Sequence, residues 1–151
     1  MMQRPYTLYL LLFFLLFLAF GGLYGGIAML LEPSGDLLAM GDLLPLLPVS
    51  NFTLPGLFLL VVMGLTPLAL AYGLLVQPLW GRVGRLFAWN GRHWAWTSTL
   101  LLVLVLAIWL AVQGLLIGFQ WPIQYATAVN GLLILLLALT PGVRRYCAIE
   151  G

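Results

Sequence analysis

The sequence is poor in charge. Only 7% of its 151 residues are charged, whereas a soluble domain carries about 25%. Lysine is absent, so that all six basic residues are arginines. Together with 64% hydrophobic residues and a mean hydropathy of +1.12, this composition excludes a water-soluble fold. The net charge of +2 is too small and too scattered to bind nucleic acid by neutralising phosphates.

Residues that carry chemistry are equally scarce. Cys147 is the single cysteine, which excludes an intrachain disulfide and the paired thiols of an oxidoreductase. His93 is the single histidine, which excludes haem held by two histidines of this chain. The sequence favours a reduced, idle thiol over an acylated one, and a solvated interfacial histidine over a metal ligand. No nucleophile with a base and no carboxylate pair at one depth can be assembled, so we predict a protein that is not an enzyme and has no cofactor.

Long apolar runs, by contrast, dominate the chain. A helix needs about 20 apolar residues to cross the hydrocarbon core, because its backbone amides find no water there. Four uncharged stretches meet or approach this length, at about 8–31, 54–79, 96–118 and 123–140. We therefore predict a single all-α membrane domain, a four-transmembrane-helix up-down bundle. The first run is longer than the apolar part of a signal peptide and lacks an A-x-A site, which disfavours cleavage.

The charges predict an orientation. The arginines fall on one side of the predicted spans. They are Arg4 before the first span, Arg82, Arg85 and Arg92 between the second and third, and Arg144 and Arg145 after the fourth. The first loop holds only the acidic residues Glu32, Asp36 and Asp42, and the third loop is uncharged. Because basic residues collect on the cytoplasmic side, we expect both termini there, in a bacterial cytoplasmic membrane.

Glycine is concentrated in the outer half of the first span. Gly21, Gly22, Gly25 and Gly26 form two interleaved small-xxx-small pairs, a pattern that lets another helix approach closely. The approaching helix can belong to the same chain or to a second copy. Glycine is common in membrane helices, so packing within the bundle is the favoured interpretation.

Gln113 and Asn130 are the clearest polar pair within the predicted spans. If the turn between the third and fourth spans is centred at 121–122, Gln113 and Asn130 lie at the same level in the outer leaflet. They could then form a hydrogen bond across the two helices, which would contribute about 0.6 kcal/mol. Structural stabilisation is favoured over a ligand site, because intramembrane polar groups are functional candidates mainly when charged. Pro67 lacks a backbone donor and predicts a kink in the second span that fits it to its neighbours.

The loops are predicted to lie at the membrane surface. Apolar residues recur at helical spacing after Ser34 and predict a short helix or turn at the outer surface. Glu32, Asp36 and Asp42 lack the spacing of a calcium loop, so we interpret them as solvated charges and as the best outer binding patch. In the inner loop, Val83, Leu86 and Phe87 oppose two arginines and are expected among anionic headgroups.

Three stretches of the chain carry a resemblance. Residues 25–35 (GGIAMLLEPSG), 51–64 (NFTLPGLFLLVVMG) and 109–131 (WLAVQGLLIGFQWPIQYATAVNG) stand in characteristic order and spacing. In these features the chain resembles an uncharacterised group of small bacterial four-span integral membrane proteins with no assigned function. The resemblance implies four spans and a bacterial inner membrane, and it implies no activity or site residues.

These observations define two expectations for function. The first is a non-catalytic membrane protein that associates with itself or serves as an accessory subunit of a larger membrane complex. The alternative is a transporter or binding protein for a lipidic or uncharged small molecule, with its site near Gln113, Asn130 and the glycines of the first span. Membrane lipids are the expected partners in both cases.

Overall fold

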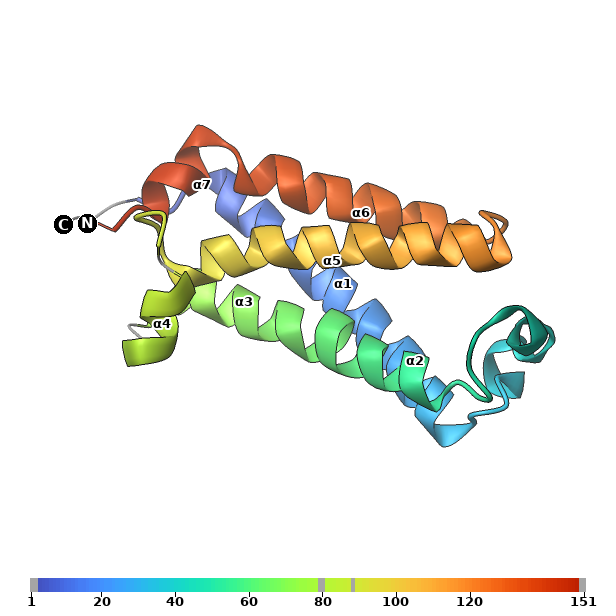
Figure 1. The fold of residues 1–151 in the computed structure, drawn as a ribbon. Coiled ribbons are helices and arrows are strands. Elements are labelled where there is room, and N and C mark those ends of the chain that lie inside the picture. Colours follow the sequence, from blue (N-terminus) through green and yellow to red (C-terminus); the bar gives the residue numbers. More distant parts are fainter. Residues whose placement is uncertain (1–2, 79–80, 88, 150–151) are drawn as a thin grey trace.

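The computed structural model describes residues 3–78, 81–87 and 89–149 (Figure 1). The predicted all-α class is confirmed, because these residues form helices, turns and one isolated bridge but no strand. The α-helices are α1 (Tyr6–Leu31), α2 (Thr53–Phe58), α3 (Thr66–Val76), α4 (Gly81–Phe87), α5 (Trp94–Ile117), α6 (Pro122–Ala138) and α7 (Pro141–Tyr146).

Three helices are long and apolar enough to cross a membrane: α1, the continuous helix Thr53–Val76 and α5. In the second of these, α2 and α3 are joined by a π-helical segment, η3 (Leu59–Leu65). The predicted fourth span is α6, which has 17 residues and is apolar. At 1.5 Å per residue it measures about 26 Å, slightly less than the roughly 30 Å hydrocarbon core.

Two predicted spans extend two or more residues past the carboxyl-terminal ends of the helices observed there. The second span ends at Val76 instead of 79, because Gln77 adopts a left-handed conformation with φ 50°; residue 79 itself lies outside the described residues. The fourth ends at Ala138 instead of 140, because Thr140 is the extended residue that starts α7. Both differences reflect local backbone geometry that hydropathy does not report.

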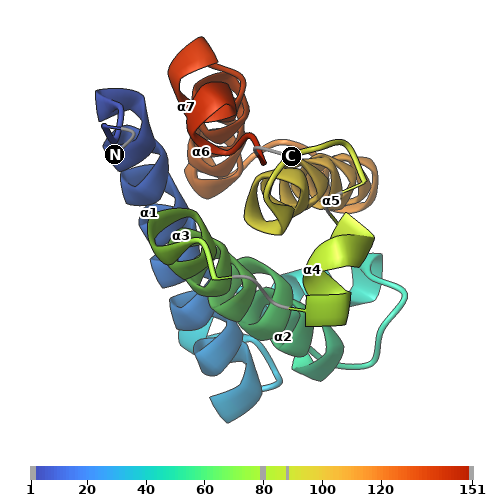
Figure 2. The same ribbon diagram turned by 90° about the vertical axis from the view of Figure 1, so that its left-hand side faces the viewer.

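The helices run between two chemically different ends (Figures 1 and 2). Both termini lie at one end together with α4 and α7, and the elements there carry all the arginines; we call it the arginine end. The opposite end, the acidic-loop end, holds the short 3₁₀ turns η1 (Asp36–Leu38) and η2 (Gly41–Leu46). Figure 1 shows α1 close to α6 near the arginine end, and the two helices diverge toward the acidic-loop end.

Glycine brings α1 against the second long helix. A Cβ atom added at Gly22 would collide with the backbone of Met63 and lie 2.6 Å from the amide nitrogen of Gly64. One added at Gly26 would lie 2.6 Å from the amide nitrogen of Leu60. The two backbones therefore touch directly, as small-residue interfaces in membranes allow.

The other two glycines of the predicted pattern do not share this contact. A Cβ at Gly21 would meet nothing within 4 Å, and one at Gly25 would make an ordinary contact at 3.5 Å with Leu59. The partner helix instead adds a glycine of its own, since a Cβ at Gly56 would lie 2.8 Å from Cβ of Met29. Of the two interleaved pairs, one packs inside the chain and the other faces outward or makes only side-chain contact.

The π-helical segment η3 lies beside the proline of the second span. Pro67 is buried and lacks the N–H that an α-helix would use. In the preceding turns the backbone hydrogen-bond pattern is π-helical, and the Thr66 hydroxyl donates to the carbonyl of Val61 at 2.9 Å. A side-chain donor thus satisfies a backbone acceptor near the proline, as membrane helices require.

The hydrophobic core is concentrated toward the arginine end. Leu8, Leu11 and Leu15 of α1 are fully buried, as is Leu74 of α3. They pack with the start of α5 and with Val143 of α7. Closer to the acidic-loop end, Phe58 and Trp109 stack with ring centroids 4.4 Å apart, which joins the second long helix to α5.

The carboxyl-terminal segment closes the arginine end through backbone hydrogen bonds. The His93 amide donates to the carbonyl of Cys147 at 2.8 Å, and the Ile149 amide donates to the carbonyl of Gly91 at 3.0 Å. Burial raises the pKa of the Cys147 thiol to about 12, an effect that the nearby Arg92 partly offsets. Because this thiol is also only 1% exposed, acylation at Cys147 is disfavoured.

The side chains of Trp96 and His93 form further hydrogen bonds at the arginine end. Trp96 Nε1 donates to the carbonyl of Ala138 at 2.8 Å. His93 caps α5: its Nδ1 accepts from the Ala95 amide at 3.3 Å, and its Nε2 lies 3.2 Å from the carbonyl of Pro78. A carbonyl only accepts, so Nε2 carries the proton and the ring is neutral. The expected solvated histidine is therefore wrong, because His93 is buried and hydrogen-bonded.

Both predicted surface segments are short. The stretch after Ser34 forms η1 and η2 instead of one helix, interrupted at Ala39, where φ is 54°. Phe52 is only 1% exposed and packs under Gly35, where an added Cβ would lie 2.5 Å from Cε2 of its ring. In α4 the arginines and Leu86 are exposed, and the Val83 side chain lies outside the described part.

Candidate functional site

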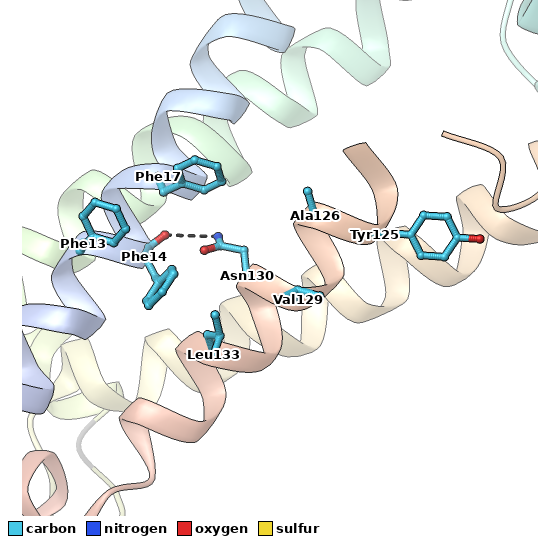
Figure 3. Close-up of a pocket in the computed structure, with 8 residues that line it drawn as sticks. All are labelled: Phe13, Phe14, Phe17, Tyr125, Ala126, Val129, Asn130 and Leu133. Atoms are coloured by element: carbon cyan, nitrogen blue, oxygen red, sulfur yellow. Dashed lines mark hydrogen bonds between the residues drawn. The ribbon is translucent and has the colours of Figure 1, made fainter. Parts of the chain in front are cut away.

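An apolar groove of about 420 Å³ lies between α1 and α6 (Figure 3). Residues at helical spacing form each wall, so that each helix presents one face to the groove. The wall from α1 consists of Phe13, Phe14 and Phe17, and the wall from α6 consists of Tyr125, Ala126, Val129, Asn130 and Leu133. Its volume falls within the roughly 300–1,000 Å³ of small-molecule sites.

Asn130 is the one buried polar side chain among these lining residues. It is 4% exposed, and its Nδ2 donates to the backbone carbonyl of Phe14 at 3.2 Å. Because a carbonyl can only accept, the amide nitrogen must face Phe14, which fixes Oδ1 as the remaining polar atom. No described residue donates a hydrogen bond to Oδ1. A buried acceptor left in this state costs about 1–3 kcal/mol.

The predicted pairing of Gln113 with Asn130 is wrong in the structure. No hydrogen bond joins them among the described residues, and Asn130 bonds to α1 instead. The turn after α5 is centred between 119 and 120, two residues before the predicted centre, since α5 ends at Ile117 and α6 starts at Pro122. Asn130 is therefore level with Trp109 by sequence count, and Gln113 lies closer to the acidic-loop end.

The rim of the groove is open. Phe13, Phe17 and Val129 are each more than half exposed, on a surface that helices of this apolarity present to lipid. The Tyr125 side chain points away from the phenylalanines of α1 (Figure 3), and its hydroxyl donates to the carbonyl of Phe119 at 2.8 Å. The groove thus has apolar walls, and its lining includes one buried, unpaired acceptor, Oδ1 of Asn130.

The acidic residues of the first loop do not converge on a common site. The Ser34 hydroxyl donates to Glu32 at 2.8 Å and accepts from the Asp36 amide at 3.3 Å, which is a local turn. Asp42 belongs to the separate turn η2. No group of three or more His, Cys, Asp or Glu side chains able to hold a metal is formed by the described residues.

Sequence reasoning found Asn130 but missed the phenylalanines opposite it. Phe13, Phe14 and Phe17 have the spacing of one helix face, which was an available signal. Phenylalanine is equally common on lipid-facing surfaces, so the spacing alone cannot distinguish a groove. The acceptor for Asn130 is a backbone carbonyl, which every residue has, and only the packing of α1 on α6 selects Phe14.

The fold and the groove define a class: an all-helical protein with three helices of membrane-spanning length and an apolar inter-helix groove. A scan of protein-family models, a search of curated proteins and a search of solved structures each found no match.

Proposed function

We propose that this chain is a four-span protein of the bacterial cytoplasmic membrane, with both termini in the cytoplasm, that binds a lipidic molecule bearing a hydroxyl or N–H donor in the groove between α1 and α6. The arginines at one end support the orientation, because basic residues collect on the cytoplasmic side. The 17 residues of α6 are at the short end of the range for a crossing helix, about 17–25.

The unpaired Oδ1 of Asn130 is the observation that carries this function. Asn130 lies eight residues from either end of α6, a distance of about 12 Å, so the acceptor stands deep in the hydrocarbon region. A ligand that satisfies this acceptor must bring a hydrogen-bond donor to this depth and must otherwise be apolar. A charged headgroup is excluded, because moving a charge into the hydrocarbon region costs too much free energy. A lipidic alcohol or amide meets both conditions.

Self-association, or service as an accessory subunit, is the second candidate. Its support is Gly21, which is exposed and would allow a close helix approach. The support is narrow, because Gly22 and Gly26 are already covered by the second long helix of the same chain. The groove has the volume of a small-molecule site, which favours a lipid chain over a partner helix there.

A matched pair of photoactivatable probes tests the binding function. The protein is reconstituted in liposomes with a long-chain diazirine alcohol or with its methyl ether, which has the same chain and no donor. We expect the alcohol to label residues 13–17 and 125–133 about 3- to 10-fold more than the ether, the range of one hydrogen bond of about 0.5–1.5 kcal/mol. Equal labelling by both probes would contradict the proposal.

Three variants locate the effect. Asn130→Leu should bring the alcohol-to-ether ratio to about one. Thr127→Val is the matched control on α6, because Thr127 bonds only to the carbonyl of Ile123 and does not line the groove, and it should keep the ratio. Ala126→Phe should reduce labelling by both probes, since the larger side chain fills the groove. A second chain crosslinked at the groove would favour the second candidate.

A further inference from the structure

A second, basic pocket of about 320 Å³ lies at the arginine end. It is lined by Arg92, Pro141, Arg144, Arg145 and Ala148. Arg92 precedes α5, whereas the other four belong to α7 and its flanks, and an isolated bridge between Arg92 and Ala148 holds the two segments together. Residues more than 45 positions apart in sequence therefore meet in one pocket.

Arg92 is held in a fixed position within this pocket. One of its guanidinium nitrogens, Nη1, donates to the carbonyl of Arg144 at 2.6 Å. Its Cζ lies 4.8 Å from the ring centroid of Trp96, a cation–π arrangement. Two interactions leave most of the five guanidinium N–H donors for another acceptor, and a held guanidinium loses less entropy when it binds.

The pocket has no described carboxylate to balance its charge. Glu32, Asp36 and Asp42 lie at the opposite end of the molecule (Figure 1), and the remaining acidic residue, Glu150, lies outside the described residues. Arg145 donates to the backbone carbonyl of Pro141 at 3.3 Å, which leaves its positive charge without a counter-charge from the described part of the chain. Three arginines with this geometry suit the oxygens of a phosphate, which guanidinium groups bind in pairs of hydrogen bonds.

We infer that this pocket binds the phosphate of an anionic phospholipid headgroup in the cytoplasmic leaflet. The long apolar helices begin or end at the arginine end, so a membrane that they cross would have its headgroups at the level of the pocket. Basic pockets between membrane helices on the cytoplasmic side bind such headgroups. This pocket shares no residue with the groove of Asn130 and lies at a different depth. The ligand proposed for the pocket is charged, whereas the ligand proposed for the groove is uncharged.

Native mass spectrometry of the full chain tests this inference. The protein is extracted from nanodiscs that contain equal amounts of phosphatidylglycerol and phosphatidylcholine with matched acyl chains. We expect preferential retention of phosphatidylglycerol, and a decrease of about 10-fold or more in Arg144→Gln/Arg145→Gln.

The matched control is Arg82→Gln/Arg85→Gln, which removes the same charge from exposed residues of α4 at the same end. We expect a decrease of less than about threefold in this variant, because these residues do not line the pocket. Equal retention of both lipids by the unchanged protein would overturn the inference. An equal decrease in both double variants would also overturn it, since that result indicates diffuse attraction.

Inorganic phosphate distinguishes the source of the ligand. Added to the detergent-extracted protein, it should displace retained phosphatidylglycerol only at millimolar concentration, because the headgroup is also anchored by its chains. Tight binding of free phosphate together with no lipid preference would identify a soluble anion as the ligand and overturn the lipid assignment. Asn130→Leu should leave phosphatidylglycerol retention unchanged, so failure of one proposal does not imply failure of the other.

Discussion

The two ends of the molecule are joined in different ways. At the arginine end, buried leucines, a hydrogen bond from the Trp96 indole to Ala138 and the backbone hydrogen bonds of the carboxyl-terminal segment connect α6 to the three long helices. Toward the acidic-loop end, α1 stays against the second long helix through Gly22 and Gly26, while α6 diverges from α1 (Figure 2). Hydrogen bonds thus close the arginine end. Toward the acidic-loop end, glycine contacts hold α1 against the second long helix, and the Phe58–Trp109 stack joins that helix to α5.

This difference accounts for the groove. Leucines fill the space between α1 and α6 where the helices are close, and farther along the space widens beside Phe17 and Asn130. In lipid there is no hydrophobic driving force to close it, because hydrocarbon chains are as apolar as the side chains. A lipid chain can therefore occupy the groove without a loss of packing.

Replacement of Gly22 by leucine should have the largest effect. The side chain would collide with the backbone of Met63, which cannot move without separating the two helices. We expect a loss of about 3 kcal/mol or more in unfolding free energy, measured by titration with a denaturing detergent. Gly21→Leu is the matched control, because nothing lies within 4 Å of its Cβ position, and it should change stability by less than about 0.5 kcal/mol. Similar losses of unfolding free energy in both variants would contradict the finding that Gly22, and not Gly21, faces the second long helix.

Removal of the indole donor at the arginine end should have a smaller effect. Trp96→Phe keeps an aromatic ring but leaves the buried carbonyl of Ala138 without its side-chain donor. We expect a loss of about 1–3 kcal/mol in the same titration. Trp89→Phe, at an indole that is 79% exposed, should be nearly neutral. A neutral Trp96→Phe would show that the closed end does not depend on this bond.

Acidification should weaken the arginine end. Burial lowers the pKa of His93, an effect that its bond to Pro78 only partly offsets. The unfolded chain therefore binds a proton more readily, so this contribution to stability is present above the ordinary pKa of 6.5 and decreases as the pH falls below it. Unfolding measured between pH 7.5 and 5 should show the decrease, and His93→Gln should abolish it. An unchanged pH profile in His93→Gln would assign the effect to other groups.

Much of this fold follows from the sequence, and the reasons are physical. Hydropathy identifies long apolar helices because the cost of an unpaired amide in lipid is large. The arginines mark one end because every loop at that end carries them. Which pair among Gly21, Gly22, Gly25 and Gly26 faces the neighbouring helix could not be predicted, since the pairs differ only by a rotation of one residue along α1.

The candidate site was only half predictable. Asn130 stands out in an apolar helix, but the residue of α5 that lies level with it depends on where the preceding turn is centred. A shift of the turn centre by two residues changes that residue from Gln113 to Trp109, four positions earlier. The basic pocket depends on a bridge between Arg92 and Ala148, which no local pattern marks. Sequence identifies the polar residues, and tertiary packing decides which of them meet.

If Asn130 accepts a hydrogen bond from a lipidic molecule in the groove between α1 and α6, that molecule should be visible in a crystal structure of the protein grown from bicelles. We expect elongated non-protein density along Phe13 and Phe17, with a polar atom within about 3.2 Å of Asn130 Oδ1. A closed groove, or an Oδ1 that accepts from a protein donor such as Gln113, would contradict it.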